Sequence, residues 1–232
     1  MTDFARFDQR HYPTVDARAG YAQWAPTYED TVEDMMDLAL LDRLDSVPWH
    51  DVTRAADLGC GSGRTAQWLR TRGPFPIDGV DLTPEMLDLA RRRGIHATLV
   101  EADLRATGLP AAAYDLAVCV LVDEHLPELG PLYDEAARLL TPSGRFVIVG
   151  YHPYFMMATG MPTHFDSPDG APTAIETHLH LPSAHHEAAR RAGLGATEMH
   201  EALVDDAFVH HKPSWEAYRG WPFSFAWVWQ RT

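Results

Sequence analysis

Short apolar runs alternate with helical segments between residues 55 and 151, and this alternation constrains the fold more than any other feature of the sequence. One run, YDLAVCVLV at 114–122, is apolar almost throughout, as expected for a parallel strand covered on both faces. Crossovers from strand to helix to strand are right-handed and build a parallel sheet with helices on both sides. The sequence therefore predicts an α/β fold with a doubly wound, mostly parallel sheet.

We expect one domain over residues 1–232, because an apolar fraction of 46% can bury a full core. Residues 1–45 are predicted to form a helical N-terminal cap, since apolar positions in 31–44 recur at helical spacing. Residues 46–151 hold the alternating elements, including a helix expected to end at Ser143 and Gly144. Residues 152–173 lack a period and are predicted to be a lid insertion over the strand ends. Residues 174–232 supply C-terminal strands and a substrate wall, beginning with a half-buried strand at 174–181.

Composition excludes several classes of partner. The chain has 19 Lys+Arg against 33 Asp+Glu, a net charge of −14, whereas a nucleic-acid binder needs clustered cations. Two cysteines are too few for a disulfide framework and suit a reducing compartment. No apolar stretch approaches the roughly 20 residues that span a membrane. We expect a cytoplasmic protein that binds neither nucleic acid nor membrane.

The stretch DLGCGSG at 57–63 forms a glycine-rich turn between a strand and a helix. Glycines there let a ligand approach the backbone where a Cβ would clash. A P-loop is excluded because Gly63 is followed by Arg64 and not by Lys, and the dinucleotide fingerprint matches only partly because its third glycine comes one position early. The carboxylate of Asp57 repels a pyrophosphate and attracts an ammonium group, which favours a ligand with a cationic end.

Two further carboxylates end the next two predicted strands. Asp81 stands where an acid accepts hydrogen bonds from both ribose hydroxyls, which fits either NAD or S-adenosylmethionine (SAM). Asp103 can accept from an adenine amino group while neighbouring apolar side chains sandwich the ring. Those side chains are Leu82, Met86 and Leu104. Together with the glycine loop, the two acids describe a site for an adenosine with a zwitterionic tail.

The motifs DLGCGSG, VDLTPEML, EADL and YDLAVCVLVDEHL, in this order, resemble those of the class I SAM-dependent methyltransferases, particularly the small-molecule, type 11-like branch. The resemblance covers roughly residues 18–150. It implies a seven-stranded Rossmann-like sheet, SAM as cofactor and S-adenosylhomocysteine as product. It also implies a cofactor site in which the loop glycines lie under the methionine moiety, Asp57 serves the ammonium group, and Tyr21 and Tyr28 belong to an aromatic element that closes over the cofactor. The loop glycines are Gly59, Gly61 and Gly63. The resemblance also places Asp81, Asp103 and the main chain near Cys119 and Val120 in this site.

Methyl transfer from a sulfonium is an in-line displacement, so the protein must align the acceptor, exclude water and in some cases remove a proton. Candidate bases follow the fourth and fifth strands, and His152 and His125 rank first because imidazole suits proton transfer near neutral pH. The remaining catalytic candidates are Glu124, Tyr151 and, in the insertion, His164. We expect no metal, because the spacing of His178 and His180 also arises from an ordinary polar strand face.

The leading hypothesis is a SAM-dependent methyltransferase acting at carbon, nitrogen or oxygen of a small aromatic or heterocyclic metabolite, as in natural-product biosynthesis. Aromatic residues in the segments predicted to cap the site suit a flat acceptor. Two alternatives stay open: a NAD-dependent oxidoreductase, and a non-methylating SAM-binding protein on the same fold. The sequence does not indicate an oligomeric state.

Overall fold

The central sheet of the computed structural model, which describes residues 4–32, 37–167 and 169–232, has the strand order β4-β3-β2-β5-β6-β10-β9. Five of its strands are parallel neighbours, and β10 runs antiparallel between β6 and β9. The strands are β2 (Ala55–Leu58), β3 (Ile77–Asp81), β4 (Thr98–Glu101), β5 (Tyr114–Val120), β6 (Leu140–Tyr151), β9 (Leu194–Leu203) and β10 (Pro222–Arg231). The predicted fold class is confirmed.

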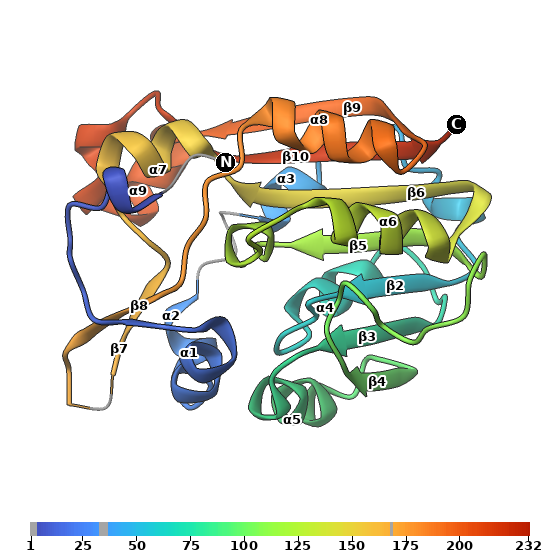
Figure 1. Ribbon diagram of the computed structural model, residues 1–232, viewed down its shortest axis with the longest axis horizontal. Coiled ribbons are helices and arrows are strands. Elements are labelled where there is room, and N and C mark those ends of the chain that lie inside the picture. Colours follow the sequence, from blue (N-terminus) through green and yellow to red (C-terminus); the bar gives the residue numbers. More distant parts are fainter. Residues whose placement is uncertain (1–3, 33–36, 168) are drawn as a thin grey trace.

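Helices cover both faces of this sheet (Figure 1). α6 (Gly130–Leu139) and α8 (Pro182–Arg191) pack on one face, and α3 (Leu38–Leu41) and α4 (Arg64–Arg70) on the other. Along β5, Ala117 faces the first pair of helices and Val118 the second, which explains why this strand is apolar throughout. α5 (Pro84–Arg93) flanks β3 and β4, and it ends at Gly94, which adopts a left-handed conformation with φ 69°.

Two predicted elements end earlier than expected. α6 stops at Leu139 and not at Ser143 and Gly144, because the following backbone enters β6 and pairs Leu140 with Tyr114 of β5. The strand predicted over 174–181 stops at Ile175. Beyond it, the amide of His178 donates to the carbonyl of Glu124, so the backbone is hydrogen-bonded to the loop after β5 instead of to a strand.

The N-terminal segment and the insertion form one small sheet outside the main one, in the order β1-β8-β7. It contains β1 (Thr14–Val15), β7 (His164–Asp166) and β8 (Pro172–Ile175), and β1 pairs in parallel with β8. The insertion is therefore ordered, since it also contains α7 (Pro153–Thr159). In Figure 1 this sheet and α1 (Ala17–Trp24) lie opposite the carboxyl ends of β2, β3 and β5.

The helix predicted over 31–44 is broken in the structure. α2 (Tyr28–Thr31) ends before Val32, which is extended, and α3 begins at Leu38, while residues 33–36 lie outside the described part of the chain. We call residues 14–32 the N-terminal strap. Further along the chain, α9 (Asp206–His211) and the 3-10 helix η5 (Pro213–Tyr218) pack beside α7 through buried aromatic side chains. Within the described residues, no helix is long and apolar enough to cross a bilayer.

Candidate functional site

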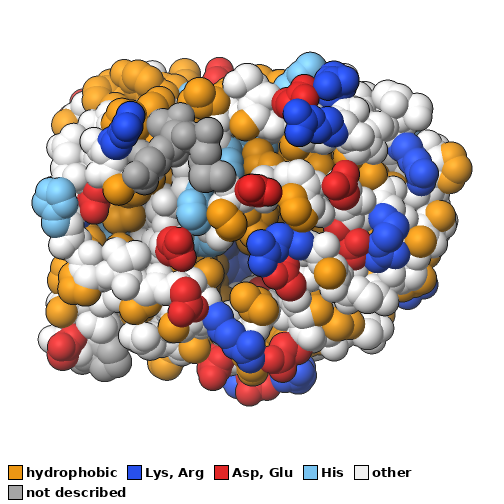
Figure 2. Space-filling view, viewed as in Figure 1, with side chains coloured by type: hydrophobic (Ala, Val, Ile, Leu, Met, Phe, Trp, Pro, Cys, Tyr) orange, Lys and Arg blue, Asp and Glu red, His pale blue; other side chains and the backbone are white. Residues whose placement is uncertain are grey.

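The glycine loop opens its backbone into a pocket at the carboxyl ends of β2, β3 and β5. Gly59 and Gly61 line this pocket, and both have positive φ values, 73° and 51°. A Cβ on Gly59 would stand 2.6 Å from a methyl carbon of Val122, so no side chain fits there. The loop therefore presents bare main chain to whatever occupies the pocket, as the sequence predicted. Figure 2 shows a hollow near the middle of this face, where β5 ends.

Asp81 ends β3 at the floor of the same pocket. Its two carboxylate oxygens accept from the amides of Gly61 and Thr83, each at 2.8 Å. Each oxygen keeps lone pairs for a ligand, so the carboxylate can also accept from a pair of vicinal hydroxyl groups. Burial raises the pKa of Asp81, while the two amide hydrogen bonds oppose that rise. This arrangement fits the ribose-binding role that the sequence predicted for Asp81.

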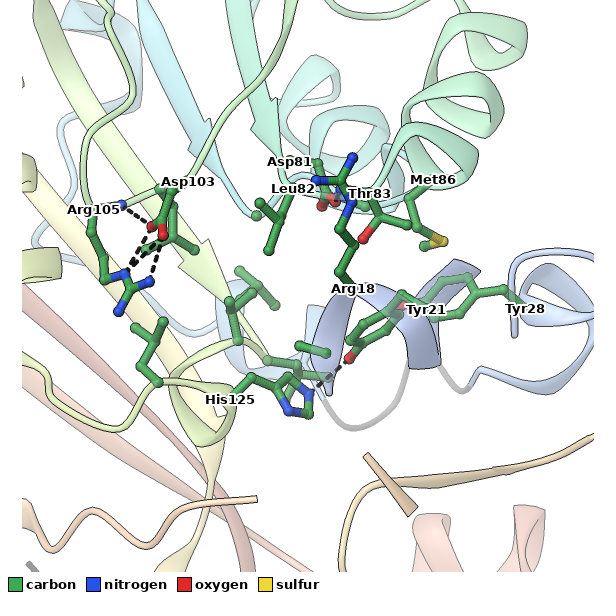
Figure 3. A pocket seen from close by; sticks show the side chains of 18 of the residues that line it. Arg18, Tyr21, Tyr28, Asp81, Leu82, Thr83, Met86, Asp103, Arg105 and His125 are labelled. Atoms are coloured by element: carbon green, nitrogen blue, oxygen red, sulfur yellow. Dashed lines mark hydrogen bonds and ion pairs between the residues drawn. The ribbon is translucent and has the colours of Figure 1, made fainter. Parts of the chain in front are cut away.

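At the far end of the pocket, Asp103 lies beside Arg105 (Figure 3), and the apolar side chains of Leu82 and Leu104 also line the pocket. Both Asp103 oxygens accept from the guanidinium of Arg105, and this ion pair holds the pKa of the Asp103 carboxyl below its usual value. Met86 also lines the pocket, from α5. The structure thus brings the predicted adenine-binding residues together, and it adds Arg105 as a direct partner of Asp103 that sequence reasoning missed.

The N-terminal strap closes the pocket from the other side. Tyr21 and Tyr28 line it, and the hydroxyl of Tyr21 lies 3.0 Å from Nε2 of His125. Figure 3 shows the side chains of Tyr21 and His125 pointing toward one another across the pocket. Burial raises the pKa of Tyr21 well above its usual value and raises that of Tyr28 to about 12, so both phenols stay neutral. Arg18 reaches over the pocket and pairs with Glu101 of β4 at 2.8 Å.

Three predicted cofactor residues lie behind the pocket. Oδ2 of Asp57 lies 3.3 Å from Nε2 of His96, and both side chains are buried, so the carboxylate faces His96 and not the pocket. Gly63 caps α4, where its φ of 86° is needed for the turn. Cys119 is fully buried in the core on the α6 side, and only its neighbour Val120 lines the pocket. These residues shape the loop and the sheet from beneath.

A second cavity, of about 890 Å³, adjoins the first and is bounded by the strap, the insertion and η5. α1 is a shared wall: Tyr21 lines the first pocket, Trp24 lines the second, and the two rings stack with centroids 5.8 Å apart. We call this the acceptor cavity. Its aromatic and methionine lining residues are Tyr12, Trp24, Tyr151, Phe155, Met156, Met161, Phe165 and Trp215.

The loop after β5 lies between the two cavities. His125 lines the cofactor pocket, and Oε1 of the buried Glu124 accepts from the hydroxyl of Thr163, which lines the acceptor cavity, at 3.3 Å. Oε2 of Glu124 has no hydrogen-bond partner among the described residues. Burial and the nearby Asp123 raise the pKa of Glu124 to about 8. Burial lowers the pKa of His125 to about 4, so this imidazole is neutral.

The acceptor cavity also receives two of the predicted catalytic residues. Tyr151 and His164 both line it. Nδ1 of His164 lies 2.9 Å from the carbonyl oxygen of Pro162, so Nδ1 carries a proton and donates to that carbonyl. Burial raises the pKa of Tyr151, and the neighbouring Glu124 raises it further, which keeps the phenol protonated.

His152, which ranked first with His125 among the predicted bases, lines neither cavity. Its Nδ1 accepts from the amide of Tyr154 and so caps the N-terminus of α7, while its Nε2 lies 2.9 Å from a carboxylate oxygen of Glu201. The prediction is corrected for this residue: the side chain turns toward the helix that it starts. His178 and His180, which share an alternating spacing in the sequence, lie beyond the end of β8, and Nε2 of His180 is bonded to the carbonyl of Leu126. Within the described residues no cluster of three His, Cys, Asp or Glu side chains could hold a metal.

The pocket offers bare backbone at one end, a carboxylate for vicinal hydroxyls in the middle, and an apolar slot with an acid at the other end. Such a pocket is suited to adenosine carrying an amino-acid tail. On a doubly wound sheet, this pocket defines a class I SAM-dependent methyltransferase domain. SAM is the cofactor of this class. The backbone at Gly59, where no side chain fits, and the remaining lone pairs of the Asp81 carboxylate suit SAM.

Comparison with known proteins agrees. Residues 56–148 match the family described as "Methyltransferase domain". A trans-aconitate 2-methyltransferase from Azoarcus sp. (strain BH72) is 34% identical over 148 residues, 62% of this chain and 54% of that protein. The chain spans about half the length of the curated relatives it matches.

Among solved structures, a SAM-dependent methyltransferase from Mesorhizobium loti superposes with a TM-score of 0.66 at 25% identity, covering 87% of this chain and 99% of that one. The [4+2]-cyclase SpnF has the same fold, with a TM-score of 0.63 at 16% identity over 95% of this chain and 98% of its own. Residues 56–148 therefore match a methyltransferase domain, and the chain has the fold of the class I SAM-dependent methyltransferases.

Proposed function

We propose that the chain transfers the methyl group of SAM to an oxygen, nitrogen or carbon atom of a small aromatic or heterocyclic compound bound in the acceptor cavity. The observation that carries this proposal is the position of Glu124. Glu124 itself lines neither cavity, but its buried carboxyl accepts a hydrogen bond from Thr163, which lines the acceptor cavity, and the next residue in the chain, His125, lines the cofactor pocket. A group that must remove a proton as a methyl group crosses from one cavity to the other belongs at this junction.

The aromatic character of the acceptor is supported by the walls of its cavity. Trp24 and Phe165 stack with centroids 5.7 Å apart and an interplanar angle of 13°, and both line the cavity. Flat aromatic walls hold a flat ring by stacking and by burial of apolar area. A volume of about 890 Å³ lies within the range of cavities that bind drug-sized ligands.

Bound SAM supplies a methyl group already activated on a sulfonium, so the protein has no covalent nucleophile to provide. Glu124 is the proposed general base: with a pKa of about 8 it takes a proton from a phenol or a ring N–H near neutral pH. His125 has a different role. Its Nδ1 donates to the carbonyl of Glu176 and its Nε2 accepts from Tyr21, so it positions the strap over the cofactor. The hydrophobic walls exclude water during the transfer.

A second candidate is a non-methylating protein that uses bound SAM structurally. The fold shared with the cyclase SpnF supports keeping this alternative. The two functions differ in one product, because only methyl transfer converts SAM into S-adenosylhomocysteine. The dehydrogenase alternative is disfavoured, since the pocket presents the partly matched glycine loop together with a strap of tyrosines over it.

The first test is calorimetric titration of the full chain with S-adenosylhomocysteine and, separately, with NAD. We expect binding of S-adenosylhomocysteine alone. Incubation with SAM and a panel of phenols and heteroaromatic amines then measures S-adenosylhomocysteine release, with Glu124→Gln as the catalytic control. Binding of NAD, or of neither compound, would contradict the cofactor assignment. The non-methylating alternative would be favoured if the chain binds S-adenosylhomocysteine and converts an acceptor but releases no S-adenosylhomocysteine from SAM with any acceptor.

A further inference from the structure

The acceptor cavity carries cations that its aromatic walls do not explain. Arg10 and Lys212 both line it, and Lys212 is the only lysine in the chain. Among the described residues, Asp166 is the one carboxylate that lines the same cavity, so the described cations there outnumber the described acids. This balance runs against a chain with a net charge of −14. A local excess of positive charge in a strongly acidic protein favours a negatively charged ligand at that place.

Arg10 is held in position by its backbone, while its side chain has no hydrogen bond or ion pair to the part of the chain that the structure describes. The amides of Arg10 and His11 donate to a carboxylate oxygen of Asp8, and the amide of Gln9 donates to the carbonyl of Gly160 at the end of α7. This turn fixes the start of the Arg10 side chain against the rim of the cavity. The guanidinium makes no ion pair with any other described residue. It therefore keeps its forked donors for a ligand.

Lys212 lines the same cavity from the end of α9. Its Nζ lies 5.1 Å from the centre of the Trp215 ring, and Trp215 also lines the cavity. The aromatic face holds the aliphatic stem and orients the ammonium group. A ligand in this cavity thus meets cations from two segments far apart in sequence, residues near 10 and residues near 212.

We propose, resting on the methyl-transfer function above, that Arg10 and Lys212 form an anion subsite and that the acceptor is an aromatic compound carrying a carboxylate. The carboxylate accepts charge-assisted hydrogen bonds from the two cations, and the ring lies against Trp24 and Phe165. The atom to be methylated then faces the Glu124 junction. The subsite selects the acceptor and fixes its direction in the cavity, so neutral aromatic compounds of the same size bind more weakly.

Two fluorescent probes separate the charge from the ring system: 1-anilinonaphthalene-8-sulfonate and N-phenyl-1-naphthylamine, which differ only in the sulfonate. The full chain, saturated with S-adenosylhomocysteine, is titrated with each dye. We expect the anionic dye to bind about tenfold more tightly than the neutral one. In Arg10→Gln and Lys212→Gln we expect the affinity for the anionic dye to fall several-fold. In the double variant the preference for the anionic dye disappears, and the affinity for the neutral dye is unchanged in all variants.

Arg190→Gln is the matched control, because Arg190 lies on α8 in an exposed cluster with Glu187 and changes the net charge equally. We expect it to leave both dyes unchanged. Three results would each overturn the subsite. They are equal affinity of the wild type for the two dyes, no binding of either dye, and the same loss of affinity for the anionic dye in Arg190→Gln as in Arg10→Gln. Calorimetry with S-adenosylhomocysteine, run on every variant, checks the fold and the cofactor pocket separately, so failure of the subsite is distinguished from failure of the proposed function.

Discussion

The hydroxyl of Tyr21 lies 3.0 Å from Nε2 of His125, and this hydrogen bond joins the N-terminal strap to the loop after β5. On its other side, Nδ1 of His125 lies 2.9 Å from the carbonyl oxygen of Glu176, in the segment that follows β8. One neutral imidazole therefore connects three parts of the chain, and its tautomer is fixed by the carbonyl. The relationship gives the strap a defined closed position over the cofactor pocket.

We expect Tyr21→Phe to weaken binding of S-adenosylhomocysteine about tenfold. The substitution removes the only donor to the buried Nε2 of His125 among the described residues, and an unsatisfied buried acceptor costs about 1–3 kcal/mol. Calorimetric titration measures the change. Tyr154→Phe is the matched control, because the side chain of Tyr154 is 46% exposed and lines neither cavity. Equal affinity in wild type and Tyr21→Phe would show that the strap does not depend on this bond.

Asp81→Asn is expected to reduce cofactor affinity by about a hundredfold or more. The substituted amide has one acceptor oxygen where the carboxylate has two, so the amides of Gly61 and Thr83 are no longer both satisfied, and a charge-assisted hydrogen bond to the ribose is lost at about 1.5–3 kcal/mol. The control is Asp88→Asn on α5, where the carboxylate pairs with Arg91 at the surface. Retained affinity in Asp81→Asn refutes the site assignment.

Glu124→Gln is expected to leave S-adenosylhomocysteine binding within about twofold and to lower methyl transfer by a factor of about 10²–10⁴, the usual contribution of a general base. In the wild type, the rate rises with pH through about 8, because the carboxyl must lose its proton before it can accept one. A pH profile of kcat measures this. A rate that is flat across that range in the wild type, or an active Gln variant, excludes Glu124 as the base.

The same residue makes stability depend on pH. The pKa of Glu124 rises from 4.5 to about 8 on folding, so the unfolded chain loses this proton first and the folded state is progressively destabilised as pH rises through that interval. The neutral Gln side chain does not titrate. Glu124→Gln is therefore expected to match the wild type in urea unfolding near pH 4.5 and to exceed it near pH 8. A constant difference at both pH values contradicts the assigned burial.

His152→Ala is expected to cost about 1 kcal/mol of folding free energy and to leave methyl transfer unchanged, since His152 caps α7 and lines neither cavity. His152→Asn restores most of the stability, because Asn is a good N-cap. Urea unfolding and initial rates of S-adenosylhomocysteine release measure the two effects. A stable but inactive His152→Ala variant would restore the catalytic role that sequence reasoning gave this residue.

The cofactor pocket could be predicted because its chemistry follows strand ends. Asp81 and Asp103 lie at or just beyond the carboxyl ends of successive parallel strands, and those ends meet at one edge of the sheet. The glycine loop likewise depends on local conformation, since Gly59 and Gly61 need positive φ values that few other residues adopt. For these residues, the position at a strand end or in the glycine loop is enough to predict the place in the site.

The acceptor cavity was decided only by the tertiary structure. Its walls come from the strap, the insertion and the region of η5, and the parallel pairing of β1 with β8 brings the first two together. The same holds for single side chains: Asp57 turns to His96 and His152 turns to α7, because a side chain follows its best available partner. Local sequence specifies which residues stand at the strand ends, whereas the partners that orient them and close the second cavity come from distant segments brought together by packing.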